Sequence, residues 1–141
     1  MKTAILFLIL ILLANLILGV GLKFYRFNYF DTTLHFLGGF FIAMFLAQYL
    51  GDSIKESNPH PNKIKMALII VGAAVFIGVM WEFIEYLATN FLGQFLVNKY
   101  NLRCCIGNLD DTINDLTMDI LGAAVFVLIL MRKKLISKPF S

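Results

Sequence analysis

Four long apolar stretches constrain what this chain can fold into more than any other feature of its sequence. A helix needs about 20 mostly apolar residues, at ~1.5 Å each, to cross the hydrocarbon core of a bilayer. The stretches that meet this requirement are residues 4–22, 32–50, 66–92 and 112–131. They predict an all-α, multi-pass membrane protein with four spanning helices.

Composition agrees with that reading and excludes several classes of protein. The chain has 141 residues, of which 60% are hydrophobic and 15% charged, whereas a typical soluble domain has about 25% charged residues. This balance argues against a soluble enzyme, a nucleic-acid-binding protein and a disordered segment. The length predicts one membrane domain, residues 1–141.

The first apolar stretch also has features of a cleaved signal peptide, because it follows a lone Lys2. Its apolar run of 19 residues is longer than the roughly 7–15 residues usual for such peptides, and it lacks a clear Ala-x-Ala cleavage site. We therefore expect a retained helix, with cleavage as the alternative.

Short connections between successive spans favour an antiparallel four-helix bundle. They cover residues 23–30, 51–65 and 93–110, and the last is apolar enough that we expect it to lie flat on the membrane surface as a lid. One side of the membrane would hold eight lysine and arginine residues and the other four. The positive-inside rule then places both termini in the cytoplasm.

Most acidic residues gather near the outer ends of the second, third and fourth stretches. His35, Glu82 and Asp115 each lie 17 residues from the charged residue that flanks the inner end of their stretch, which puts all three about 25 Å from the cytoplasmic boundary. Spacings of three or four residues within each stretch let every helix aim its acids at one interior point. The acids in this zone are Asp31, Glu82, Glu85, Asp110, Asp111, Asp115 and Asp119.

The free-energy cost of these acids favours a functional site over simple helix association. One Asp near the centre of a spanning helix costs about 2.5–3.5 kcal/mol, whereas an interhelical hydrogen bond contributes only about 0.6 kcal/mol on average. Helix association by hydrogen bonding remains the structural alternative. The functional readings are a divalent metal site, proton or ion handling, and a polar ligand pocket.

Of these interpretations, a divalent metal site accounts most specifically for the types of residue present. Carboxylates suit Mg²⁺, Mn²⁺ or Ca²⁺, and an added imidazole also allows Zn²⁺ or iron. The Glu-x-x-His repeat of di-metal helical bundles is absent from the sequence. The candidate metal ligands are His35, Glu82, Glu85, Asp111, Asp115 and Asp119, and the candidate catalytic residues, without assigned roles, are these six together with Asp31.

Other residues receive more modest interpretations. Trp81 is expected to serve in packing or as an interface anchor, with a pocket wall as the alternative. The glycine pair at residues 38–39 and the small residues 122–124 predict close helix approach. The adjacent Cys104 and Cys105 would form a strained bond with each other, so free thiols or an intermolecular link are expected, without a catalytic role.

Three segments together carry a resemblance to a known family: residues 31–39 (DTTLHFLGG), 81–85 (WEFIE) and 111–123 (DTINDLTMDILGA). The combination resembles the YjdF-like family of small bacterial inner-membrane proteins, and more loosely VanZ-like proteins. The resemblance implies a multi-pass protein of the cell inner membrane. It implies no reaction, because the family has no established activity.

The first functional hypothesis is a divalent cation held near the extracytoplasmic surface, acting on a lipid-linked or envelope substrate. A small ion- or proton-coupled permease or accessory subunit is the second, and a structural or assembly protein the third. The expected partners are the lipid bilayer and a lipid-linked substrate, with a homo-oligomer as a further prediction and no nucleic acid.

Overall fold

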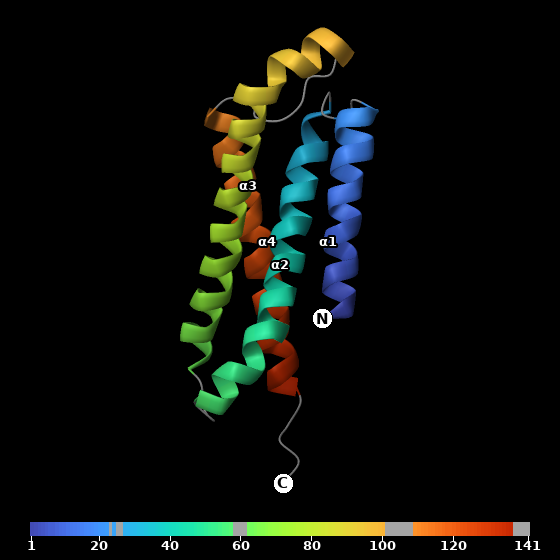
Figure 1. Ribbon diagram of the computed structural model, residues 1–141. Coiled ribbons are helices and arrows are strands. Elements are labelled where there is room, and N and C mark those ends of the chain that lie inside the picture. The colour runs from blue at the N-terminus through green and yellow to red at the C-terminus, as the bar shows by residue number, and fades with distance from the viewer. Residues whose placement is uncertain (23, 25–26, 58–61, 101–108, 137–141) are drawn as a thin grey trace.

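In a computed structural model, described for residues 1–22, 24, 27–57, 62–100 and 109–136, the chain forms four long helices (Figure 1). Helix α1 (Lys2–Ala14) continues into the π-helical segment η1 (Asn15–Gly21). Helices α2 (Asn28–Ser57), α3 (Lys63–Tyr100) and α4 (Leu109–Ile136) follow. All four are long and apolar enough to cross a membrane, which confirms the predicted all-α, four-span class.

The helices extend beyond the bounds that the sequence predicted. Helix α2 begins at Asn28 and ends at Ser57, and α3 continues to Tyr100, so parts of all three predicted connections are helical. Of the predicted connection 93–110, residues 93–100 continue α3, residues 109–110 begin α4, and residues 101–108 lie outside the described residues. The predicted bounds follow the ends of the apolar runs, whereas hydrogen bonding within a helix also supports turns beyond the hydrocarbon.

Helices α2, α3 and α4 pack on one another, and α1 packs on α2 alone within the described part of the chain. Successive helices run in opposite directions (Figure 1). One end of the bundle is where α2 and α4 begin and α3 finishes, and we call it the distal end. The last turns of α3 bend across this end in Figure 1, which agrees with the predicted cover but makes it helical.

Large apolar side chains are exposed around the outside of the bundle. Leu68 and Phe76 on α3 and Leu128 on α4 are among them. A continuous apolar surface of this kind is rare on a protein surrounded by water and is normal on one surrounded by lipid. The chain is therefore a multi-pass membrane protein.

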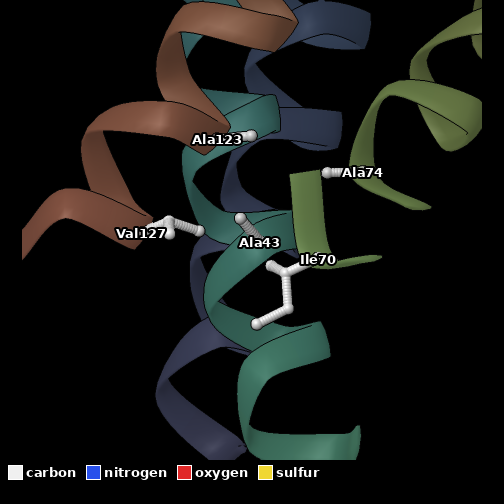
Figure 2. Packing of buried hydrophobic residues seen from close by; sticks show 5 residues of the cluster. All are labelled: Ala43, Ile70, Ala74, Ala123 and Val127. Carbon is white, nitrogen blue, oxygen red and sulfur yellow. The ribbon is translucent and has the colours of Figure 1, made fainter. Parts of the chain in front are cut away.

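Small side chains close the middle of the three-helix core. Ala43, Ala74 and Ala123 are fully buried and come from α2, α3 and α4, and they pack with Ile70 and Val127 (Figure 2). Helices in lipid associate through close van der Waals packing, because lipid tails leave little hydrophobic driving force between them. This alanine layer lets the three backbones approach closely just below the polar residues described next.

Candidate functional site

Five ionisable side chains are buried together on α2, α3 and α4, toward the distal end. Each is at most 7% exposed: His35, Glu82, Glu85, Asp115 and Asp119. Asp31 joins them with a side chain that is 16% exposed. We call these six residues the acidic cluster.

His35 lies at the centre of this cluster. Its Nε2 atom is 3.5 Å from Glu82 Oε1 and 3.8 Å from Asp31 Oδ1. Its Nδ1 atom is 3.4 Å from Asp119 Oδ2. The two sides of the imidazole therefore face different helices, with Asp31 and Glu82 on one side and Asp119 of α4 on the other.

Two overlapping sets of residues bring their ligand atoms within 4.8 Å of one another: Asp31, His35 and Asp115, and His35, Glu82 and Glu85. Both sets depend on His35. A neutral imidazole has one nitrogen lone pair to offer, because the other nitrogen carries the proton. The sets therefore represent alternative ligands around one position and not two separate ions.

Three carboxylate oxygens in this cluster are buried and have no hydrogen-bond partner among the described residues: Asp31 Oδ1, Glu82 Oε1 and Asp115 Oδ1. Leaving such a group unsatisfied costs about 1–3 kcal/mol, and more if it is charged. A tetrahedral ion with ligands at ~2.1 Å would hold neighbouring ligand atoms about 3.4 Å apart. The distance of 3.5 Å from Nε2 to Glu82 Oε1 is close to that spacing and the distance of 3.8 Å to Asp31 Oδ1 is longer, so the cluster could hold a cation.

Three glycines allow Asp119 to lie between α2 and α3: Gly39 and Gly78 leave space for Asp119 itself, and Gly122 lets α4 approach α2. A Cβ atom on Gly39 would overlap the backbone of Asp119, and one on Gly78 would overlap its carboxylate. A Cβ on Gly122, one turn further along α4, would overlap the carbonyl of Phe36. The predicted close approach at residues 38–39 and 122–124 is thus confirmed for Gly39 and Gly122.

Two hydrogen bonds lie at or next to the acidic cluster. Trp81 donates from Nε1 to Glu85 Oε1 over 3.0 Å, and Asn114 donates from Nδ2 to Thr32 Oγ1 over 3.1 Å. The first bond orients a carboxylate of the cluster. The second joins α2 to α4 at the distal end.

The structure gathers most of the residues that the sequence singled out. Asp110 and Asp111 are exposed at the start of α4. Of the predicted metal ligands, Asp111 and Asp119 belong to neither of the two ligand sets, whereas Asp31, which was not predicted as a ligand, belongs to one. Cys104 and Cys105 lie outside the described residues. The acids of α4 thus divide into an exposed first turn and a buried pair, Asp115 and Asp119.

A cavity of about 440 Å³ adjoins the cluster. Both His35 and Asp119 line it, together with Trp81 and with Asn15 of η1. Trp81 thus takes the alternative role of a pocket wall, whereas the parts played by Asn15 and Gly78 were not predicted from the sequence. A signal for Asn15 was present, because it is the one strongly polar side chain within the first apolar stretch.

Comparison with known proteins identifies the family of this chain but no reaction that it catalyses. Residues 1–134 match the family described as "Predicted membrane protein (DUF2238)". An "Uncharacterized protein" of Thermotoga maritima is 34% identical over 119 residues, which are 84% of this chain and 56% of that protein. The chain thus spans about half the length of this relative. No solved structure matches the chain.

Proposed function

This chain belongs to the DUF2238 family of predicted membrane proteins, and from that premise we propose that it binds one divalent cation in the acidic cluster and acts there on a lipid-linked substrate. The observation that carries the proposal is the set of three buried carboxylate oxygens without partners. Two of them, Glu82 Oε1 and Asp31 Oδ1, lie 3.5 and 3.8 Å from His35 Nε2, and Asp115 shares a possible ligand set with Asp31 and His35. A bound cation would supply the positive charge that offsets the negative charge of these buried oxygens.

The two nitrogens of His35 take different roles in this proposal. A neutral imidazole that donates from Nδ1 to Asp119 Oδ2, 3.4 Å away, would keep the lone pair of Nε2 directed at Glu82 and Asp31. Histidines that bind metals commonly donate their second N–H to a carboxylate, which fixes the ring and its tautomer. We therefore propose Asp119 as a positioning residue and Glu82, with Asp31, Glu85 or Asp115, as the ligands beside His35.

The remaining carboxyl groups give the site its chemistry. A divalent cation offsets two negative charges, so some of the five carboxyl groups in the cluster keep a proton or a free lone pair when it binds. When bound, the cation would polarise an oxygen atom of the substrate or of water. A carboxylate outside the ligand set can then take or return a proton at that oxygen.

The part of the bundle below the cluster argues against an ion-conducting path, which was the second hypothesis. There α2, α3 and α4 close on Ala43, Ala74 and Ala123, all fully buried. A conducted ion needs polar groups or water along its path. Within the described residues the core at this level is apolar, which favours a site that binds over one that conducts.

Metal analysis of the purified protein tests the proposal directly. We expect about one equivalent of a divalent metal after dialysis against a mixture of Mg²⁺, Mn²⁺, Ca²⁺, Zn²⁺ and Fe²⁺, measured by elemental analysis. His35→Ala and Asp115→Asn should lose it. Asp110→Asn, which changes an exposed acid on the same helix, should retain it. Metal-free wild-type protein, or equal loading of all four proteins, would contradict the proposal.

We also propose the finer assignments made from the sequence: a YjdF-like inner-membrane protein whose distal end faces away from the cytoplasm. The distribution of lysine and arginine supports this orientation. Cys104 and Cys105 lie in the connection between α3 and α4 and provide natural labels. A membrane-impermeant maleimide should modify them in intact cells, and modification only after lysis would reverse the orientation.

A further inference from the structure

The cavity beside the acidic cluster lies among α1, α2 and α3. Leu12 of α1, Ile42 of α2 and Ile84 of α3 all line it. Helix α1 packs on α2 and, within the described residues, does not pack on α3. The cavity is therefore bounded on the inside by α2 and is open sideways between α1 and α3, toward the surface that lipid surrounds.

The lining changes in character along the bundle. Near the distal end it includes Asn15, His35 and Trp81, with Asp119 one helical turn deeper. Further from the distal end it consists of apolar side chains such as Leu8 and Phe45. From Leu34 to Phe45 the lining extends along α2 for about 16 Å. The cavity thus has its polar side chains in its distal half, beside the apolar Leu34 and Ile84, and a long apolar floor further from the distal end, in the same order as a lipid of the distal leaflet.

We propose that this cavity holds one hydrocarbon chain of a membrane lipid, whose polar headgroup reaches His35 and Asp119. The inference deepens the proposed function and rests on it for the cation that would meet the headgroup. It names the substrate class as a lipid that enters sideways from the bilayer, between α1 and α3.

Size and surroundings favour a chain over other occupants. The volume of about 440 Å³ is within the range of roughly 300–1,000 Å³ for small-molecule sites, which are mostly apolar with a few polar groups. Water leaves apolar cavities empty, and the molecules that surround a spanning helix at this depth are lipid chains. Because lipid tails are as apolar as the lining, the chain itself adds little affinity, so the headgroup determines which lipid binds.

Trp81 offers a direct measurement, because it lines the cavity and is the single tryptophan of the chain. We would reconstitute the protein into vesicles of phosphatidylcholine brominated in the middle of one acyl chain, since bromine quenches tryptophan fluorescence on contact. Wild-type emission should be strongly quenched. Gly38→Leu, which fills the cavity, should lose most of that quenching.

Gly72→Leu is the matched control, because Gly72 is also a helical glycine, does not line the cavity, and has nothing within 4 Å of an added Cβ. It should be quenched like the wild type. Ile42→Phe, paired with the exposed Ile69→Phe, repeats the test if Gly38→Leu fails to fold. Equal quenching of the filled and control variants, or no quenching of the wild type, would overturn the inference.

The type of chain can be resolved in the same vesicles. Relief of quenching by a small fraction of unbrominated polyprenyl phosphate would assign a polyprenyl chain, and no relief an acyl chain. Metal content, measured on the same samples, keeps the two proposals separate. Loss of quenching in Gly38→Leu without any metal in the wild type would support the lipid and refute the cation, and the reverse pattern would refute only the lipid.

Discussion

Two layers of the same three helices differ in almost every property. The outer layer contains His35, Glu82 and Asp115, and the alanine layer contains Ala43, Ala74 and Ala123, in each case eight residues further from the distal end. Eight residues are about 12 Å of helix. Both layers are buried, but one consists of ionisable groups and the other of single methyl groups.

The difference assigns the two layers different roles: the alanine layer stabilises the bundle, and the outer layer forms the candidate site. The alanine layer brings three backbones into close contact and leaves no polar atom to satisfy, which stabilises helix association in lipid. The outer layer holds carboxylates that repel one another around a single imidazole. Buried charges of this kind contribute little to stability and are retained for what they bind. Substitutions in the two layers should therefore have opposite effects.

The largest expected effect comes from removing an acid of the outer layer. Asp115→Leu should stabilise the metal-free protein by about 1–3 kcal/mol, because it removes a buried carboxylate oxygen that has no hydrogen-bond partner among the described residues. Saturating metal should shift the difference toward the wild type, since it stabilises only the protein that binds it, by about 2.7 kcal/mol at 100 times the Kd. Denaturant titration in detergent with and without chelator measures both. Asp110→Leu at the exposed start of α4 should change neither, and a metal-free Asp115→Leu protein less stable than the wild type would mean that the outer layer is structural.

A single methyl group added next to the alanine layer should have the opposite sign. In Gly122→Ala the new Cβ overlaps the backbone carbonyl of Phe36, so α2 and α4 must separate. Overpacking of this kind destabilises by about 1–3 kcal/mol. Gly72→Ala, whose Cβ meets nothing within 4 Å, should be neutral or slightly stabilising in the same titration. Equal stability of the two variants would mean that α2 and α4 are not held at this distance.

The sequence was sufficient to predict the outer layer, but it did not predict the alanine layer or the details of either. The cost of burying charge in lipid identifies the spans, and counting residues from the flanking charges put His35, Glu82 and Asp115 at one level. The structure confirms that they meet, within the two ligand sets around His35. Helical spacing, however, predicts that the acids of α4 form a stripe but not which way that stripe faces within the bundle. Gly39, Gly78 and Gly122 fix that rotation by the space they leave, which is why Asp115 and Asp119 are buried and Asp111 is exposed.

The position of α1 could not be predicted from the sequence, for a different reason. Its apolar residues surround the helix on all sides, so no stripe indicates which face meets a neighbour. The structure packs it on α2 alone, within the described residues, and leaves a cavity beside α3. The length of α3 was also missed, because Gly93 and Gln94 interrupt the apolar run without interrupting the helix.

A smaller effect within the outer layer should distinguish ligands from positioning residues. Asp119→Asn keeps the shape of the side chain and an oxygen that can accept from His35 Nδ1, but removes the charge. Changes to such second partners typically lower metal affinity about 10- to 100-fold. Titration calorimetry should therefore find weakened binding in Asp119→Asn, whereas His35→Ala abolishes it. Complete loss in both would make Asp119 a ligand, and no loss in Asp119→Asn would remove its positioning role.

The smallest effect should come from the hydrogen bond that Trp81 donates to Glu85 over 3.0 Å. Trp81→Phe keeps an aromatic ring at this position and removes the donor. One such bond contributes about 0.5–1.5 kcal/mol, so metal affinity should fall about 2- to 10-fold if Glu85 must be oriented for binding. Tyr86→Phe, which removes an exposed hydroxyl from the next turn of α3, should leave the affinity unchanged. Unchanged affinity in Trp81→Phe would exclude Glu85 and select Asp31 or Asp115 as the ligand that joins His35 and Glu82, because Trp81 donates to Glu85 alone among them.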